Sequence, residues 1–252
     1  MEIIQVDQTN IDNEHICCAI GNDKVNRSRA QLKKDWLKQR FNEGHVFKKF
    51  NVRGKVFVEY VPAEFAWAPV EAPGYIFMHC LWVSGRYKGQ GLGKKLVEEC
   101  ISNSCDKNGI AVIVTKNKKP FMTDKKFFLQ MGFEVCDEAP PYFELLVKKN
   151  KKAPLPKFRD CARKANNGEN EGMTFYYSDQ CPFTGDFVDI MMDVARKYGI
   201  NSHKIKFETT EQAQNAPSPF TIFSLFYKGE FLTFELMTAS GFEKFLKKTL
   251  NL

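Results

Sequence analysis

Apolar residues recur along the first half of the chain at two spacings, one typical of strands and one typical of helices. A helix is expected over residues 28–41, because Ser28 and Gln31 form a capping-box pair and Leu32, Trp36 and Leu37 share an apolar face. Strands follow over residues 46–52 and 55–61. The run YIFMHCLWV (75–83) is apolar on both faces, which predicts a buried central strand. The remaining elements are an amphipathic helix (92–105), a strand (111–115), a short helix (123–131) and strands 133–136 and 142–147.

The second half of the chain repeats the same kinds of pattern. A strand (173–177) precedes a helix after Cys181-Pro182, in which Phe187, Ile190, Met191, Val194 and Tyr198 have helical spacing. A strand over residues 204–207 is followed by two strands, 220–227 and 230–236, around a hairpin turn. A capping box at Ser240 and Glu243 begins the last helix. The expected order is βαβ, then ββα.

The segment KKNKKAPLPKFRDCARKANNGENEG (148–172) separates the two patterns. Its like charges repel, its prolines break regular structure, and its Asn/Gly cluster favours turns. We therefore expect a domain over residues 1–148, a basic, proline-containing linker over 149–171 and a smaller domain over 172–252.

Composition excludes several classes of protein. The 252 residues are 43% apolar and include 23 phenylalanines, so the chain can bury a core. No apolar run is long enough to cross a membrane, and the acidic N-terminus argues against a secretory signal. The eight cysteines are expected to be reduced thiols of a cytoplasmic protein, without zinc-finger spacing or a metal site. A net charge of +7 suits an anionic ligand and lacks the dense basic stripe of a nucleic-acid binder.

The segment VSGRYKGQGLGKKL (83–96) carries the clearest chemistry. A buried strand leads into a glycine-rich turn and then into an amphipathic helix, so that backbone amides and the positive helix end can hold an anion. The spacing fits neither the dinucleotide-binding nor the Walker fingerprint. Arg86-x-x-Gly89-x-Gly91 resembles the Q/R-x-x-G-x-G/A signature of the GNAT superfamily of acyl-CoA-dependent N-acetyltransferases.

The resemblance extends over most of residues 1–148. It includes the strand before the glycine turn, the helix after it, the strand AVIVT and the segment FFLQMGFEV, which is similar to the closing motif of the family. The segment EYVPAEFAWAPVEAPGYIFMHCLWV and the added C-terminal domain resemble the YoaP-like branch. The implied fold is α/β (α+β), with a mixed, mostly antiparallel sheet flanked by helices.

The resemblance implies acetyl-CoA as cosubstrate and a primary amine as acceptor. Its pyrophosphate would bind amides of residues 88–94, its pantetheine arm would pair with the strand before the turn, and an amide of that strand would polarise the thioester carbonyl. The amine would attack directly. The residues implied in binding acetyl-CoA are Leu81, Val83, Arg86, Lys88, Gly89, Gln90, Gly91, Leu92, Gly93, Lys94 and Phe128.

The catalytic groups are less well defined. Phe128 stands where the family often has a tyrosine that protonates the leaving thiolate, and a phenyl ring cannot do so. A base must take a proton from the amine, and the candidates are His79, Glu71 and Glu59. A hydrogen-bonded core histidine is the more common role for a residue in the position of His79. Residues 61–74 are expected to form a wall of the acceptor site. Nearby lysines could attract the 3′-phosphate of CoA: Lys116, Lys118, Lys119, Lys125 and Lys126.

The C-terminal domain resembles the thioredoxin fold, on the evidence of its element order and of Cys181-Pro182-Phe183-Thr184. Such a fold implies a cis-proline before its third strand, for which Pro219, or alternatively Pro217, is the candidate. Cys181 at a helix N-terminus would have a lowered pKa. Since Thr184 replaces the second cysteine, only a monothiol role is open, with Cys161 or an external thiol as partner. A scaffold without redox chemistry is the favoured alternative.

Three functions are therefore compared. The first is an acetyl-CoA-dependent N-acetyltransferase acting on a small-molecule or peptide amine. The alternatives are a CoA-binding regulatory module without turnover, and a monothiol redox protein that uses Cys181. Neither nucleic acid nor a membrane is an expected partner, and the sequence leaves the oligomeric state and the amine open.

Overall fold

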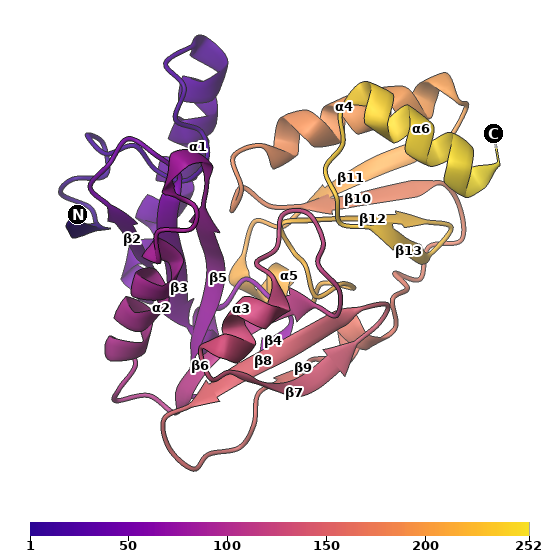
Figure 1. Cartoon of the computed structure of the whole chain (residues 1–252). Helices are drawn as coiled ribbons and strands as arrows, with labels where there is room; N and C mark the ends of the chain where they lie inside the picture. The colour runs from indigo at the N-terminus through magenta and orange to yellow at the C-terminus, as the bar shows by residue number, and fades with distance from the viewer. Residues whose placement is uncertain (252) are drawn as a thin grey trace.

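The computed structural model describes residues 1–251 as two larger β-sheets and their helices, together with one two-stranded ribbon (Figure 1). The first sheet has seven strands in the order β1-β2-β3-β5-β6-β8-β7. The second has four strands in the order β11-β10-β12-β13, and β4 pairs with β9 in the ribbon. In the first sheet, β5 and β6 run parallel and the other neighbours run antiparallel, as expected for a mixed, mostly antiparallel sheet.

The expected strands and helices occur in the expected order, and the structure adds β1, β4, β9 and α5, which were not expected. In the first part of the chain they are β1 Ile3–Val6, α1 Lys24–Arg40, β2 Val46–Phe50, β3 Val56–Pro62, β4 Val70–Glu71, β5 Ile76–Val83, α2 Leu92–Ser102, β6 Gly109–Thr115, α3 Lys125–Gln130, β7 Glu134–Ala139 and β8 Phe143–Lys149. In the second part they are β9 Lys157–Phe158, β10 Met173–Tyr177, α4 Thr184–Lys197, β11 Ser202–Lys206, α5 Thr210–Gln214, β12 Phe223–Tyr227, β13 Glu230–Thr233 and α6 Ala239–Leu250.

Helices α1 and α2 cover opposite faces of the first sheet. Along β3, Val56 and Val58 pack in one core with Leu96 of α2. Phe57 points the other way and packs with Leu37 of α1. Successive side chains of a strand point to opposite faces of the sheet, and here both faces are buried. The sheet is therefore the middle layer of the first part of the molecule.

The parallel pair β5 and β6 separates part of the way along its length. Three residues of each strand are paired, from Ile76 opposite Ile110 to Met78 opposite Val112. Beyond this point β5 continues to Val83 and β6 to Thr115 without further pairing to each other. The separation leaves backbone groups at the centre of the molecule free to bind something other than the neighbouring strand.

The four-stranded sheet has its first two strands parallel and the rest antiparallel. Helices α4 and α6 cover one face, where Phe175, Leu225 and Leu246 share a core (Figure 1). The opposite face, with Tyr176 and Phe226, packs against the first part of the molecule. The order βαβ followed by ββα agrees with the structure, which adds the short helix α5 between β11 and β12.

Residues 149–171 are packed against the rest of the protein along part of their length. Strand β9 pairs with β4, so that Phe158 lies opposite Val70. Arg163 forms an ion pair with Asp137 of β7. The division of the chain into two domains and a linker stays a prediction.

Two helix starts were predicted wrongly. Helix α1 begins at Lys24, and the side chain of Asp23 accepts the N–H of Asn26, so the expected cap at Ser28 lies inside the helix. Helix α6 is capped by Thr238 instead of Ser240. A capping-box pattern also occurs within helices, because serine and glutamine or glutamate are tolerated there.

Two residues expected on buried helix faces are exposed. Leu32 of α1 and Ile190 of α4 are 48% and 38% accessible to solvent. In α1 the buried face instead includes Lys33, together with Trp36 and Leu37. Lys33 lies one turn before Leu37, and this spacing places it on the buried face of the helix. The sequence alone did not predict its burial, because a lysine is rarely buried unless it is paired.

Candidate active site

The glycine turn places two residues in the left-handed backbone region directly before α2. Gly89 and Gly91 have φ angles of 76° and 72°, which other residues rarely adopt. No side chain caps the first turn of α2, where Gly91 is the N-cap residue. The backbone N–H groups at this end are therefore available to an anion, and the helix dipole favours a negative charge there.

A cavity of about 470 Å³ lies over this turn and extends to the open side of β5. Its other walls include Met122, Thr123 and Phe127. Eight of the residues expected to bind acetyl-CoA line it: Leu81, Val83, Lys88, Gly89, Gly91, Leu92, Gly93 and Lys94. We refer to this space as the donor cavity.

Three residues expected in the same site lie outside the donor cavity. Arg86 donates to the Tyr87 hydroxyl, with a distance of 2.9 Å between its Nη2 and the oxygen. The Gln90 amide donates to the Arg86 carbonyl and so braces the turn from within. Phe128 is fully buried and packs edge-to-face on Phe133. These three side chains stabilise the turn and the nearby core, and their contact with a ligand stays a prediction.

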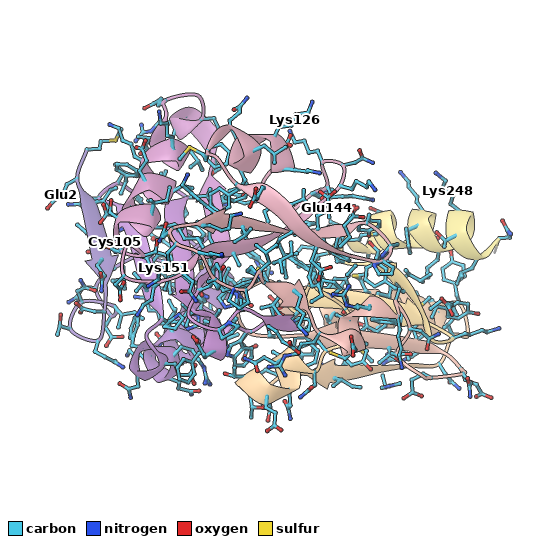
Figure 2. The ribbon with its side chains drawn as sticks, turned by 90° about the horizontal axis from the view of Figure 1, so that it is seen from below. Glu2, Cys105, Lys126, Glu144, Lys151 and Lys248 are labelled. Atoms are coloured by element: carbon cyan, nitrogen blue, oxygen red, sulfur yellow. The ribbon has the colours of Figure 1, made fainter. Side chains whose placement is uncertain are left out.

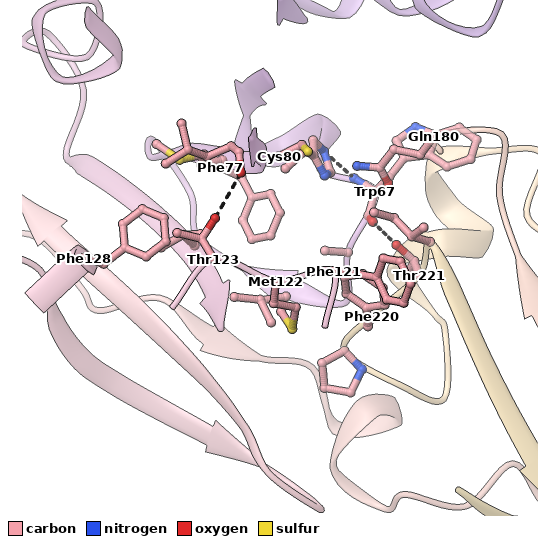
Figure 3. A pocket seen from close by; sticks show the side chains of 18 residues that line it. Trp67, Phe77, Cys80, Phe121, Met122, Thr123, Phe128, Gln180, Phe220 and Thr221 are labelled. Carbon is pink, nitrogen blue, oxygen red and sulfur yellow. Dashed lines mark hydrogen bonds between the residues drawn. The ribbon is translucent and has the colours of Figure 1, made fainter. Parts of the chain in front are cut away.

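The separation of β5 and β6 contains a second, smaller pocket of about 60 Å³, which we name the junction pocket (Figure 3). Leu81, Met122 and Thr123 line both this pocket and the donor cavity. The Thr123 hydroxyl donates to the Leu81 carbonyl at 3.1 Å. The main chain of Leu81 therefore faces the opening between the strands, and so does its N–H, since both backbone groups of a strand residue point to the same side.

His79 lies at an irregularity of β5. The register with β3 passes from Glu59 opposite Cys80 to Tyr60 opposite Met78, so His79 is the extra residue of a bulge. Its Nε2 accepts the Trp67 N–H at 3.2 Å. Burial, with the nearby positive charge of Lys33, lowers the pKa of His79 to about 3. The imidazole is neutral at ordinary pH and makes the hydrogen bond of a core histidine, although it also lines the junction pocket.

Glu59 forms a buried ion pair with Lys33. Both carboxylate oxygens accept from the lysine ammonium at 2.8 Å, and the two side chains are almost inaccessible to solvent. Burial raises the pKa of Glu59, while the charge of Lys33 opposes the increase. Sequence reasoning identified Glu59 and missed its partner, which comes from α1.

Glu71 lies apart from the cavities. It belongs to β4, is exposed, and pairs with Lys157 of β9 at 2.8 Å. The hydrogen bond from Lys157 lowers the pKa of this carboxyl group. Glu71 lines none of the three cavities described here, so the structure does not bring it together with Glu59 and His79.

A third cavity of about 300 Å³ lies between the two sheets. We name it the interdomain cavity. It shares Cys80, Phe121, Gln180, Phe220 and Ile222 with the junction pocket. The donor cavity, the junction pocket and the interdomain cavity are therefore neighbours in one series that passes the separation of β5 and β6.

Cys181 lines the interdomain cavity, together with Cys17, Cys18 and Cys80. The expectation of a lowered pKa for Cys181 is wrong. Burial raises the pKa, although a hydrogen bond from the Phe183 backbone opposes the increase. Helix α4 begins only at Thr184, so Cys181 lies before its first turn. Desolvation of the thiolate therefore affects the pKa more than the positive end of the helix does.

The expected cis-proline is also wrong. Among residues 1–251, the cis peptide bond joins Pro140 to Pro141, and the bonds before Pro217 and Pro219 are trans. A proline in the sequence leaves the isomer open, because the two forms differ by only about 0.5–1 kcal/mol. Pro219 lines the junction pocket all the same.

Three of the five lysines expected near the 3′-phosphate are paired with carboxylates. Lys125 binds Glu144 at 2.6 Å, and Lys116 and Lys119 lie 3.8 and 3.5 Å from Glu138 and Glu235. Lys126 is exposed at the edge of the molecule (Figure 2). A role in binding the phosphate stays a prediction for these residues and for Lys118.

Comparison with known proteins shows which families and solved structures the chain is similar to. Residues 52–135 match the acetyltransferase (GNAT) domain family, and residues 203–244 match the YoaP-like family. A PaiA N-acetyltransferase from Thermoplasma acidophilum, solved in complex with coenzyme A, is 15% identical, with a TM-score of 0.40 over 59% of this chain and 99% of its own. YhbS from Escherichia coli, a GNAT family N-acetyltransferase solved with CoA, is 17% identical, with a TM-score of 0.37 over 63% and 89%.

The family match and the relative named next identify the chain as a GNAT acyltransferase, which has an additional C-terminal sheet. It belongs to the family of a Bacillus subtilis protein described as "Uncharacterized N-acetyltransferase YoaP", with which it is 40% identical over 246 residues, 96% of this chain and 97% of the relative. No helix within residues 1–251 is both long and apolar enough to cross a bilayer.

Proposed function

We propose that the protein transfers an acetyl group from acetyl-CoA to a primary amine by direct attack. The observation that carries the proposal is the position of the uncapped α2 N-terminus beside the separation of β5 and β6. Such an end binds the pyrophosphate, while the free strand edge at Leu81 and Val83 pairs with the pantetheine arm. Gly89 and Gly91 leave open space where a Cβ atom would be, so the ligand can approach the backbone.

The size of the junction pocket supports acetyl over longer acyl groups. Its volume is about 60 Å³, against about 470 Å³ for the donor cavity and about 300 Å³ for the interdomain cavity. The pocket therefore holds a group of a few atoms, and Phe77 and Phe128 close it. A long acyl chain would require these aromatic side chains to move.

The residues around the junction pocket supply the chemistry of transfer. The Leu81 N–H polarises the thioester carbonyl as the amine nitrogen attacks it. The new C–N bond forms, the C–S bond breaks, and its electron pair leaves on the CoA sulfur. Of the three base candidates we favour Glu59, because it lines the interdomain cavity and its raised pKa suits it to accept a proton. In this proposal the proton passes from the amine to Glu59 through cavity water.

For the C-terminal part we propose a thioredoxin-like fold that serves as a wall of the active site. The strand order and the parallel pair β10 and β11 support this fold. The raised pKa of Cys181 favours a structural role over a monothiol redox role.

The donor site can be tested at Gly93 without disturbing the turn. A Cβ atom there would lie 3.6 Å from Phe127 and Val83, an ordinary contact, and the residue is helical. Gly93→Glu should keep the fold, because a carboxylate suits the first helical turn, yet it should weaken acetyl-CoA binding at least about tenfold by repelling the pyrophosphate. Gly93→Ala is the matched control and should retain binding.

The measurement is thermal unfolding with and without acetyl-CoA, followed by mass spectrometry of the amine product. Ligand at 100 times its dissociation constant should add about 2.7 kcal/mol to the stability of the unmodified protein and of Gly93→Ala. A missing shift in the unmodified protein, or an equal shift in Gly93→Glu, contradicts the proposed donor site.

A further inference from the structure

Gln180 is a buried amide with an unused acceptor. The residue is 5% accessible to solvent, and its side-chain Oε1 has no hydrogen-bond partner within residues 1–251. It comes from the turn between β10 and α4, in the C-terminal part of the chain. Leaving a buried carbonyl unpaired costs about 1–3 kcal/mol. Such a group needs an explanation, and a bound ligand that supplies the missing donor is one.

The unpaired oxygen of Gln180 belongs to a residue that lines two neighbouring cavities. It lines the junction pocket, together with His79, Cys80 and Leu81 (Figure 3), and it also lines the interdomain cavity. The residue therefore lies where the proposed acyl group and an incoming amine would meet. The loop that carries Gln180 is held by its own contacts. The Thr184 hydroxyl donates to the Ser178 carbonyl at 2.7 Å, and the Arg29 guanidinium of α1 lies 4.8 Å from the centre of the Phe183 ring.

We infer that Gln180 binds the acceptor amine, and that the acceptor is a primary monoamine with an apolar body held in the interdomain cavity. This inference rests on the proposed acetyl transfer and deepens it. It assigns to the C-terminal part of the chain a residue that contacts the substrate.

The walls of the interdomain cavity support an apolar body. They are formed largely by aromatic side chains, including Phe57, Trp82, Phe183 and Phe234. A volume of about 300 Å³ falls at the lower end of small-molecule sites, which have about 300–1,000 Å³. A compact aromatic or branched aliphatic group fits such a space and loses its contact with water there.

The charges around the cavity argue against a polyamine. Its carboxylate, Glu59, has both oxygens bound to Lys33. Burial raises the pKa of Cys17 and Cys18 to about 12, so both thiols are neutral. Lys55 adds a positive charge to the lining. A substrate with several ammonium groups would leave its charges unpaired in this cavity.

The same environment prepares the amine for reaction. An apolar cavity disfavours the charged ammonium, so a bound amine gives up its proton more readily than in water. Gln180 Oε1 can then accept one N–H of the neutral amine, and the nitrogen keeps its lone pair for attack on the carbonyl carbon.

The test compares two amines and two variants. We expect the unmodified protein to acetylate 2-phenylethylamine with a kcat/KM at least about tenfold above that for spermidine. Gln180→Met keeps the side-chain volume but removes the acceptor, and should raise the KM for 2-phenylethylamine about tenfold or more. Gln214→Met is the matched control, because Gln214 is a glutamine of the same C-terminal part that donates to the Glu64 carbonyl of the first part but lies outside the cavity.

Each outcome separates the inference from the proposed function. Acetyl-CoA should raise the melting temperature of Gln180→Met as much as that of the unmodified protein, which shows an intact fold and donor site. A preference for spermidine, an unchanged KM in Gln180→Met, or an equal increase in Gln214→Met overturns the inference. Acetyl-CoA binding without acetylation of either amine overturns the assigned substrate class. An absence of acetyl-CoA binding instead overturns the proposed function.

Discussion

The ion pair of Lys33 and Glu59 is the most demanding feature at the scale of single residues. Two charges lie in the interior, with the Lys33 ammonium 4.1 Å from the centre of the Trp36 ring and His45 3.6 Å from a Glu59 oxygen. Burial lowers the pKa of His45 well below its usual value, so it remains neutral beside them. Desolvation of two ions offsets much of their attraction, and such a pair is therefore weak evidence for stability. Glu59 also lines the interdomain cavity, so the pair lies beside the proposed acceptor site.

This reasoning predicts the order of stability in a double-mutant cycle. Lys33→Met leaves Glu59 buried and unpaired, and should lower the free energy of unfolding by about 3–5 kcal/mol. The double variant Lys33→Met/Glu59→Leu removes both charges and should be more stable than Lys33→Met alone. Urea unfolding at pH 7 measures the difference.

Activity adds a second measurement to the same cycle. If Glu59 accepts the proton, the double variant should lose acetyl transfer at least about a hundredfold while it still binds acetyl-CoA. Full activity in a stable double variant would rule out Glu59 as the base.

At the residue scale, the sequence was most informative where a local motif defines the backbone. Gly89 and Gly91 could be assigned to a tight turn before a helix, and both have positive φ angles. The partners of Glu59 and the environment of Cys181 could not be assigned, because Lys33 and the cavity come from segments distant in the chain. Gln180 carries no motif, so only the structure shows its unpaired oxygen.

The start of α1 provides a prediction at the scale of a secondary-structure element. Asp23→Ala removes the acceptor for the Asn26 N–H, and should destabilise the protein by about 1 kcal/mol. Ser28→Ala is the control, because Ser28 is exposed inside the helix and alanine is a better helix former there. Thermal unfolding of the two variants should show a loss for Asp23→Ala and no loss for Ser28→Ala. The reverse result would mean that the helix begins at Ser28.

The elements that the sequence predicted best have a strong apolar period. The strand 75–83 and the helix 92–105 correspond to β5 and α2 within a few residues. Strands β4 and β9 have two residues each, which is too few to show an alternation of apolar and polar positions. Each forms because it pairs with the other. Short pairings of this kind depend on tertiary contacts and were not predicted.

At the scale of the whole molecule, the two halves of the chain share hydrophobic cores. One core joins Phe57 and Trp67 to Tyr176 and Phe226, and another joins Phe143 to Phe234. An exposed ion pair of Arg29 with Asp186 adds little energy but fixes the same arrangement. Separating the halves would expose these aromatic side chains to water. We therefore expect the chain to unfold as one cooperative unit, although the sequence divides it into two patterns.

Leu246→Ala tests this cooperativity. Leu246 is fully buried in α6, in a core whose described residues all lie between Met173 and Leu250. The substitution should lower the free energy of unfolding by about 2–5 kcal/mol, which corresponds to a decrease in melting temperature of at least about 5 °C. All three tryptophans, Trp36, Trp67 and Trp82, lie in the first half, and their fluorescence reports on this half and on its contact with the C-terminal sheet. If the chain unfolds as one cooperative unit, the midpoint temperatures measured by tryptophan fluorescence and by circular dichroism decrease by the same amount. A tryptophan transition that stays in place while circular dichroism shows an earlier step would demonstrate two independent domains, with the C-terminal sheet only loosely attached to the active site.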